Sequence, residues 1–453
     1  MNRRKLLNSI RKVPPQVNYI ISETFLNSTM LYGKLYKDYQ NKLLANYKFY
    51  DNKHDLINLV NTAILNVPYY REKYKNLVIK SIDDFQKNIG FIDKGEINKN
   101  FKFFFSDVEN IDQYDLLTTG GTSGTPLKLY LPKNRYIQEL ATLHFIWHNA
   151  IGFKNEFKAV LKNHKLNGKT YRVDPITKEF IFDGFTFTNH YFDKIYAVLK
   201  KYKIKYLLCY PSSGYEFCKY VYTSGKDFSF LKAIIASSEN TYNFQMKLFI
   251  EKMGLKFFTW YGHTEKLVCA GYCANANYYH VEPTYGYCEL LDEYNNPVMH
   301  KGQIGEIVGT TLHNYGMPLI RYRTGDFAEF LANECPHCGR KVTLFKTILG
   351  RWKGDRIYTN DGTYVTTTAL NLHDEHYLVL DGIQYFQERK GELEVRIIPN
   401  NKFTENHKIS LVQHFESIFK NKMIINIKEV NYLEKLPNGK FLLLLSKIPD
   451  NDA

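Results

Sequence analysis

The sequence predicts an α/β fold in which a large N-terminal region is followed by a smaller α+β unit. Apolar residues recur at helical spacing over residues 1 to about 110. Segments typical of strands then alternate with helical segments over 195–270, which indicates α/β layers. The turn signals N-D-G at 360–362 and P-N-G at 437–439 indicate hairpins near the C-terminus.

The elements of the N-terminal region follow from periodicity and from turn residues. The stretch Asp55–Leu65 places its apolar residues on one face of a helix. A loop rich in glycine, threonine and serine follows at 117–128. After it we expect a strand at Leu127–Leu131 and a helix from Asn134 to about Ala150.

The central and C-terminal regions predict further elements in a regular order. We expect strands at Ile204–Cys209, Ala233–Ser237 and Lys256–Tyr261, and a helix at Phe244–Met253. From Gly286 to Glu329, glycine and proline punctuate a β pattern. A boundary near Gly350–Asp355 would divide the chain into two domains, residues 1–350 and 351–453.

The composition indicates a folded protein of the cytoplasm. Of its 453 residues, 44% are hydrophobic and 15% aromatic, which excludes a disordered chain. No apolar run is long enough to span a bilayer, and the N-terminus lacks the unbroken apolar segment of a signal peptide. The seven cysteines form no disulfide-scaffold pattern, and we therefore expect a reducing compartment.

The charge is strongly positive. Lysine and arginine number 60 against 46 acidic residues, so the formal net charge is +14. Such a surface would attract nucleic acid, anionic lipid or a polyphosphate substrate. The start, Met1 to Lys12, is locally basic and would either contact an anionic membrane or simply be solvated. Because the other basic residues are dispersed, we expect no nucleic-acid partner and at most peripheral membrane contact.

The loop Leu117–Lys128 reads L-T-T-G-G-T-S-G-T-P-L-K and is the most informative segment. Glycines allow a backbone to approach a ligand closely, hydroxyl and amide groups donate to phosphate oxygens, and lysine neutralises charge. These are the properties of a nucleotide-phosphate loop. It differs from a Walker A loop, because Thr125 stands where that motif has its lysine. The alternative is a polar turn.

Four further motifs follow this loop. Ser237-Ser238-Glu239 ends a predicted strand, and W-Y-G-H-T-E follows another at 260–265. Y-R-T-G-D occupies 322–326, and Gly439-Lys440 precedes a final apolar run. Taken singly, each is more often structural than functional, with Glu265 or Asp326 a buried or capping carboxylate.

In this order and spacing, the motifs resemble those of adenylate-forming enzymes, the superfamily of acyl-CoA synthetases, luciferases and peptide-synthetase adenylation domains. The similarity is greatest to the phenylacetate–CoA ligase-like branch, and within it to members linked to capsule and surface-polysaccharide synthesis. Three more stretches resemble this branch: N-V-P-Y-Y-R-E-K-Y at 66–74, P-L-I-R-Y-R-T-G-D at 318–326 and I-L-G-R at 348–351. The resemblance implies a large N-terminal adenylation domain and a small mobile C-terminal lid domain.

The resemblance also implies roles for individual residues. Tyr261 would stack near adenine, flanked by Ser238 and Glu239. Asp326 would hold the ribose hydroxyls, with Arg351 adding a contact. Thr264 would bind the α-phosphate, Glu265 the Mg²⁺, and Lys440 would be the catalytic lysine. The β- and γ-phosphates would be held by Thr118, Thr119, Gly120, Gly121, Thr122, Ser123, Gly124 and Lys128.

These roles suit the reaction that the resemblance implies. Attack of a carboxylate on the α-phosphate brings two anions together, so neutralisation and positioning supply most of the catalysis. Lys440 would bridge the two anions, and its small domain must close over the large one. The family pattern G-R-x-x-D appears here as G-R-W-K-G-D, which places Lys353 at the hinge position and displaces Asp355.

A separate motif, Cys335-Pro-His-Cys338, presents two thiolates at a spacing suited to Zn²⁺. Cys273 and His280 are the expected other ligands of a structural site, and relatives of the branch have a similar pattern. Cys269 is an alternative to Cys273, and His337 to His280. The cysteines could instead be free or buried, and a redox role lacks a thioredoxin-like context.

Three other histidines are weaker candidates. His144 and His148 stand at i and i+4 on the predicted helix, where packing against a core or an acyl pocket is favoured over metal binding. His263, within W-Y-G-H-T-E, either contacts substrate or packs.

The sequence therefore predicts an ATP- and Mg²⁺-dependent ligase that converts a carboxylic acid to an acyl-adenylate and releases pyrophosphate. The acyl acceptor would be coenzyme A, or an amine or hydroxyl group in surface-polysaccharide biosynthesis. The alternative is a non-catalytic, zinc-bearing basic protein that binds nucleic acid or a membrane surface.

Overall fold

The structure, a computed structural model, describes most of the chain in two compact units. The described residues are 13–25, 28–118, 127–162, 164–166, 168–184, 186–239, 241–351, 356–370, 372, 376, 379–419, 421–435 and 442–448. One unit comprises 21–156 and 258–349, and the other comprises the residues up to 20, 157–257 and those from 350 onward. One boundary between the units falls at Gly350, but the unit that begins there also contains 157–257, so the division into domains 1–350 and 351–453 stays a prediction.

The N-terminal helical region is confirmed. Its helices are α2 (Pro15–Phe25), α3 (Ser28–Ala45), α4 (Lys53–Asn66), α5 (Pro68–Lys73), α6 (Ile82–Asn88) and α7 (Lys94–Lys99). Side chains begin two of these helices, because Ser81 accepts the Asp84 amide and Asp93 accepts the Glu96 amide. None of the helices in the described part of the chain is long and apolar enough to cross a bilayer.

The loop at 117–128 connects two strands of a hairpin, β1 (Tyr114–Thr118) and β2 (Lys128–Pro132). The predicted strand and helix that follow it are confirmed, as β2 and as α8 (Arg135–Ile151). Gly152 ends α8 in the left-handed conformation, with φ of 74°, which glycine adopts without steric cost.

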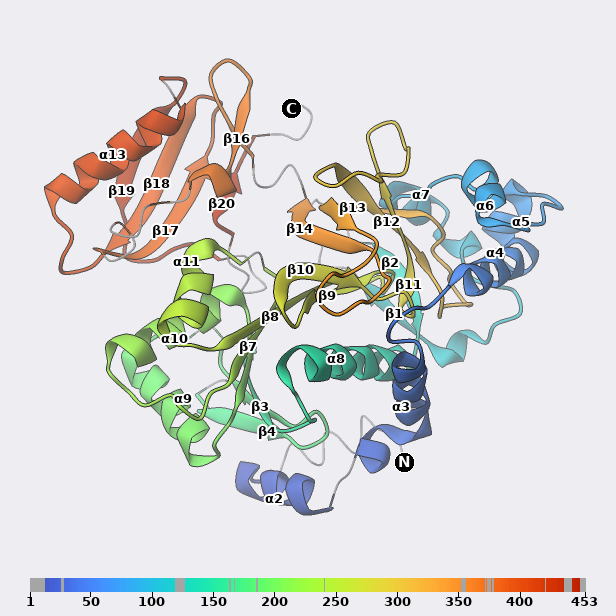
Figure 1. Cartoon of the computed structure of the whole chain (residues 1–453), viewed down its shortest axis with the longest axis horizontal. Helices are drawn as coiled ribbons and strands as arrows, with labels where there is room; N and C mark the ends of the chain where they lie inside the picture. Colours follow the sequence, from blue (N-terminus) through green and yellow to red (C-terminus); the bar gives the residue numbers. More distant parts are fainter. Residues whose placement is uncertain are drawn as a thin grey trace. The chain divides into compact units, whose positions relative to one another are not determined.

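The rest of this unit is an antiparallel sheet, seen in Figure 1 as the yellow and orange strands. Its strands lie in the order β11-β12-β13-β14-β10-β9-β8. Their bounds are β8 (Lys256–Gly262), β9 (Cys269–Cys273), β10 (Ala276–Val281), β11 (Gly286–Leu291), β12 (Ile304–Thr311), β13 (Tyr322–Ala332) and β14 (Leu344–Arg351). The predicted strand at 256–261 and the β region at 286–329 are thus confirmed.

The other unit contains a largely parallel sheet in the order β7-β6-β3-β5-β4. Its strands are β3 (Lys158–Leu161), β4 (Tyr171–Asp174), β5 (Glu179–Phe182), β6 (Tyr206–Cys209) and β7 (Ala233–Ser237), and only the pairing of β4 with β5 is antiparallel. The helices α9 (Asn189–Lys201) and α10 (Pro211–Thr223) connect β5 to β6 and β6 to β7. This strand–helix alternation confirms the predicted α/β layer.

One predicted helix differs in type. Over the predicted range Phe244–Met253, the α-helix α11 covers Asn243–Met246, and Lys247–Lys252 is π-helical. Leu248 and Phe249 of the π-helical segment are both buried in the core.

The region after residue 350 has the predicted α+β character. The N-D-G turn is confirmed, because it joins β15 (Arg356–Tyr358) to β16 (Tyr364–Thr366), with Gly362 at φ of 80°. The helix α13 (Glu405–Phe419) packs on a sheet in the order β19-β18-β17-β20, as Figure 1 shows. These strands are β17 (Leu380–Gln387), β18 (Glu392–Pro399), β19 (Ile424–Glu429) and β20 (Leu444–Ser446). The P-N-G turn at 437–439 lies outside the described residues.

A buried ion pair joins the antiparallel sheet to the N-terminal helices. Arg321 Nε and Nη2 donate to the Glu289 carboxylate at 3.1 and 2.9 Å, and both side chains are almost fully buried. Arg321 Nη1 donates to the carbonyl oxygens of Ile89 and Gln86, at the end of α6. The Phe91 ring covers the guanidinium at 4.1 Å. The arginine therefore connects β11, the start of β13 and the segment after α6.

We expect Glu289→Gln to destabilise the fold by about 3–5 kcal/mol, because it leaves the buried Arg321 charge without its carboxylate. The measurement is the free energy of unfolding in guanidinium chloride. Arg71→Met is the matched control, since it breaks a half-exposed ion pair with Asp107 and should cost less than about 1 kcal/mol. Equal losses for the two variants would contradict the structural role of Glu289.

Candidate nucleotide and metal sites

The Y-R-T-G-D segment forms a tightly held turn within β13. Thr324 Oγ1 donates to the Ile307 carbonyl at 2.6 Å and accepts the Asp326 amide at 3.1 Å. The Gly325 amide donates to Glu306 Oε1 at 3.2 Å. Gly325 has φ of 73°, which a residue with a side chain rarely adopts. These contacts fix the backbone that carries the Asp326 carboxylate.

The structure brings Tyr261 and Asp326 together, although they stand 65 residues apart. Tyr261 lies near the end of β8, and its hydroxyl donates to Asp326 Oδ2 at 2.7 Å. Burial raises the pKa of Tyr261 well above its usual value, and the Asp326 charge raises it further. The phenol therefore remains a hydrogen-bond donor at all ordinary pH values and orients the carboxylate.

Glu265 lies just after β8 and is held by a histidine two residues before it. His263 Nε2 accepts the Val268 amide at 3.3 Å, so the ring proton resides on Nδ1 and is donated to Glu265 Oε2 at 3.2 Å. Both side chains are largely buried. Thr264 stands between these two residues in the sequence, and its side chain is half-buried. In the described structure, His263 is thus a positioning residue for Glu265.

The chain after Glu265 lies in a slot that two glycines create. A Cβ atom on Gly286 would stand 1.8 Å from the Leu267 carbonyl oxygen, and one on Gly309 would stand 2.7 Å from Leu267 Cβ. Larger residues at 286 or 309 would therefore displace the segment that follows Glu265.

Ser238 and Glu239 belong to the other unit, directly after β7. Ser238 has φ of 70°, a left-handed conformation that turns the chain sharply. Glu239 Oε2 accepts the Ser212 amide at 3.1 Å, near the start of α10. Glu239 therefore caps that helix, a structural contact that the sequence analysis did not predict for it.

The predicted phosphate loop is described only at its ends. Thr118 and Lys128 are the last paired residues of the β1–β2 hairpin, so the two ends of the loop lie side by side. Lys128 is exposed. The predicted ligands Thr119, Gly120, Gly121, Thr122, Ser123 and Gly124 lie outside the described residues, as does the side chain of Thr118.

Other predicted residues also lie outside the described structure. They include the catalytic candidate Lys440, the hinge candidates Lys353 and Asp355, and the basic segment Met1 to Lys12. Arg351 ends β14, and only its backbone is described.

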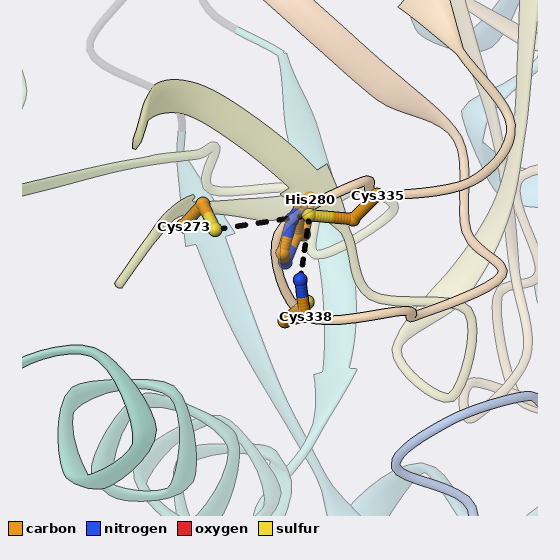
Figure 2. A group of neighbouring side chains, drawn as sticks. All are labelled: Cys273, His280, Cys335 and Cys338. Atoms are coloured by element: carbon orange, nitrogen blue, oxygen red, sulfur yellow. Dashed lines mark hydrogen bonds between the residues drawn. The ribbon is translucent and has the colours of Figure 1, made fainter. Parts of the chain in front are cut away.

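Cys273, His280, Cys335 and Cys338 converge on one point, as Figure 2 shows. Each offers one ligand atom, and these atoms all lie within 4.8 Å of one another. Cys273 ends β9, His280 lies in β10, and the two other cysteines lie in the turn between β13 and β14. The alternatives considered for this group, Cys269 and His337, do not belong to it.

The donor set fits a tetrahedral zinc ion. The Sγ atoms of Cys273 and Cys335 are 3.8 Å apart, which matches the edge of about 3.8 Å for two sulfurs each at about 2.3 Å from zinc. His280 Nε2 is buried and has no hydrogen-bond partner among the described residues. Burial, together with the nearby Arg340 charge, lowers the pKa of His280 to about 4. The imidazole is therefore neutral, the form that binds metal.

Sequence reasoning missed two neighbours of this cluster. Tyr278 places its hydroxyl 3.0 Å from Cys335 Sγ. Arg340, two residues after Cys338, makes a buried two-point ion pair with Glu282 at 2.7 and 2.9 Å and donates through Nε to the Tyr47 carbonyl. Gly339 and Arg340 directly follow the second cysteine, so the sequence could have indicated an arginine beside the cluster. No sequence pattern indicates its pairing with Glu282.

The i and i+4 histidines of α8 have protein partners. His144 Nδ1 lies 2.9 Å from the Tyr36 hydroxyl, and the ring is buried among aromatic residues. His148 Nδ1 lies 3.1 Å from the Phe153 carbonyl. These contacts favour the packing role over metal binding.

A third missed residue, Lys162, directly follows β3. Its Nζ lies 2.5 Å from Ser237 Oγ, beside the predicted Ser238-Glu239 pair. A lysine directly after the apolar run A-V-L at 159–161 was the available signal.

Comparisons of sequence connect the chain with one kind of ligase. No protein-family model matches the chain. A 63-residue segment is 41% identical to phenylacetate–coenzyme A ligase of Thermus thermophilus, and a 65-residue segment is 38% identical to that of Aromatoleum evansii. Each match spans 14% of this chain and only 14% of the relative. The resemblance to phenylacetate–CoA ligases is thereby confirmed over these segments.

Solved structures match over nearly the whole chain. The 2-hydroxyisobutyryl-CoA ligase in the postadenylation state, in complex with 2-HIB-AMP, has a TM-score of 0.65 at 16% identity and covers 87% of this chain and 88% of that one. An acyl acid amido synthetase in complex with 2,4-DB has a TM-score of 0.56 at 13% identity and covers 94% and 96%. The fold is therefore that of the adenylate-forming ligases, as predicted.

Proposed function

We propose that this protein is an AMP-forming acid ligase that uses ATP and Mg²⁺. The observation that carries the proposal is the contact between Tyr261 and Asp326 beside the held Glu265, in a fold of the adenylate-forming kind. The substrate carboxylate would attack the α-phosphorus of ATP. The bond from the α-phosphorus to the bridging oxygen would break, so that pyrophosphate leaves and the acyl-adenylate remains.

The described residues suit this chemistry. Asp326 offers carboxylate oxygens to ribose hydroxyls, and the Tyr261 phenol holds one of these oxygens in place. Glu265 offers a hard oxygen ligand to Mg²⁺, with its orientation set by His263. We assign the phosphate-binding role to the loop closed by Thr118 and Lys128, and the bridging cation to Lys440.

The second half-reaction would transfer the acyl group to an acceptor. Coenzyme A is the acceptor named by the sequence relatives, phenylacetate–coenzyme A ligases, whereas one structural neighbour is an amido synthetase. Both a thiol and an amine are therefore chemical options here. A role in capsule or surface-polysaccharide synthesis would follow if the acceptor is an amine or hydroxyl group of a sugar. The seven cysteines are all free, in keeping with a cytoplasmic location.

We also propose that Cys273, His280, Cys335 and Cys338 hold a structural zinc ion. Four protein ligands fill a tetrahedral site and leave no position for a reacting water molecule. The ion would stabilise the connection between β9, β10 and the turn before β14.

Wild-type protein should catalyse ATP–pyrophosphate exchange with at least one member of a panel of carboxylic acids and amino acids. We expect Lys440→Ala to abolish exchange while ATP binding persists, because the lysine neutralises the approaching anions. Lys447→Ala is the control, since that lysine forms an exposed ion pair with Glu388. Exchange by the Lys440 variant at the wild-type rate would show that another cation acts. No exchange with any acid, with ATP still bound, would contradict the ligase function.

Removal of one oxygen tests the nucleotide site. Tyr261→Phe should raise the KM for ATP about tenfold and leave the KM for the acid unchanged, because the Asp326 carboxylate loses a hydrogen bond that orients it. Tyr69→Phe is the matched control, since its hydroxyl donates to the Glu96 carboxylate at 2.9 Å in the N-terminal helical region. An unchanged KM for ATP in the Tyr261 variant would show that Tyr261 has no role in the proposed nucleotide site.

Elemental analysis tests the metal. Purified protein should contain about one zinc ion per chain, since the four ligands make one tetrahedral site. We expect Cys335→Ser to lose the ion and Cys269→Ala to retain it, because Cys269 lies outside the cluster. Zinc retained at full occupancy by the Cys335 variant would contradict the assignment.

A further inference from the structure

An ion pair connects the helix α8 to the residue that follows Glu265. Lys266 Nζ donates to Glu139 Oε1 at 2.5 Å, although the two residues stand 127 positions apart. Between a quarter and a third of each side chain is exposed. A pair that is partly buried in this way is screened less by water and salt than one at the open surface. The contact therefore ties the segment that carries Glu265 to α8.

Lys266 adopts a backbone conformation that residues with side chains rarely take. Its φ is 59°, in the left-handed region, where the Cβ atom crowds the following carbonyl oxygen. The Lys266 amide donates to the His263 carbonyl at 3.2 Å and closes a turn that contains Glu265. Backbone strain of this kind persists only where the surroundings hold it in place. The ion pair with Glu139 is such a contact, made by the side chain of the strained residue itself.

The helix that carries Glu139 is a rigid support. Buried side chains on α8, among them Phe145 and Trp147, pack it into the core. Arg135, one turn before Glu139 on the same face, donates to Asp115 Oδ2 at 2.9 Å and to the Pro132 carbonyl at 3.2 Å. These two acceptors belong to β1 and β2. One face of α8 thus contacts both the β1–β2 hairpin and the turn at Glu265.

The chemistry of Mg²⁺ explains why this turn needs support. Mg²⁺ requires near-ideal octahedral geometry, with oxygen ligands about 2.0–2.1 Å away. A small shift of the Glu265 carboxylate would therefore weaken the proposed metal contact. His263 orients the carboxylate from one side, and the slot at Gly286 and Gly309 holds the chain that follows. The strained residue Lys266 lies between these two fixed points, and Glu139 anchors it.

We propose that Glu139 and Lys266 are positioning residues for the proposed Mg²⁺ ligand Glu265. This inference rests on the proposed ligase function and concerns the same nucleotide site. Neither residue of the pair would contact ATP or the metal. The pair would keep the turn at Glu265 in the conformation that meets the ion. Its loss should therefore weaken the binding of the Mg²⁺ complex of ATP and leave the binding of metal-free ATP as it is.

The test measures nucleotide binding by calorimetry, with and without the metal. The probe is α,β-methylene-ATP, which cannot be cleaved between the α- and β-phosphorus, and it is titrated in buffer with Mg²⁺ and in Mg²⁺-free buffer. In Glu139→Gln, the Kd of the Mg²⁺ complex should rise about tenfold, the lower end of the cost of losing a residue that orients a metal ligand. The Kd of the metal-free analogue should be unchanged.

Further variants separate positioning from folding. Lys266→Met should have the same effect as Glu139→Gln, and the double variant should bind no more weakly than either, because both remove one interaction. Lys266→Arg keeps the charge and should retain most of the affinity. The matched control is Asp193→Asn, which breaks a partly exposed ion pair with Lys226 on α9 and should leave both constants unchanged. Thermal unfolding identifies any variant that fails to fold.

Two results would overturn the positioning role. One is an unchanged Kd of the Mg²⁺ complex in both Glu139→Gln and Lys266→Met. The other is an equal rise with and without Mg²⁺, which would show a general disturbance of the nucleotide site. If the wild type binds the analogue but exchanges pyrophosphate with no acid, the ligase function fails, and the binding constants still decide the positioning role. A wild type that binds no analogue contradicts both proposals.

Discussion

The buried pair of Arg321 and Glu289 is the contact on which the proposed nucleotide site depends. The pair joins β11 to the start of β13. Arg321 also donates hydrogen bonds to two carbonyl oxygens at the end of α6. Asp326 stands five residues after this arginine, on a turn held by Thr324 and Gly325. The carboxylate is thus positioned by a chain of contacts that begins in the core. An arginine suits this place because its planar group can satisfy several acceptors at once.

Positioning by a neighbour recurs around each candidate group. Tyr261 orients Asp326, His263 orients Glu265, and Tyr278 lies against Cys335. In each case the neighbour is a partly or fully buried side chain that supplies or takes one hydrogen bond. Arrangements of this kind keep a polar group in one rotamer before any ligand binds, which reduces the entropy lost on binding.

The sequence predicted much of the fold and the four residues that converge at His280. Periodicity located α8 and β7, and the cysteine spacing identified the group that meets at His280. The contacts of Arg340 with Glu282 and of Lys162 with Ser237 could not be predicted. Each joins residues tens of positions apart, and such pairing depends on strand order and register, which no local pattern specifies. The π-helical turns after α11 were missed because the apolar pattern of Phe244–Met253 predicts a helix but not its type.

The four proposed zinc ligands, Cys273, His280, Cys335 and Cys338, would also affect the unfolded chain. Cys273 and Cys335 are 62 residues apart, so a metal ion bound to both would close a long loop. A cross-link of that length removes entropy from the unfolded chain worth about 4 kcal/mol, if the ion acts as a disulfide does. A metal site that takes no part in catalysis would then contribute as much to the free energy of unfolding as a buried ion pair. The supply of the metal would then affect how much of this protein stays folded.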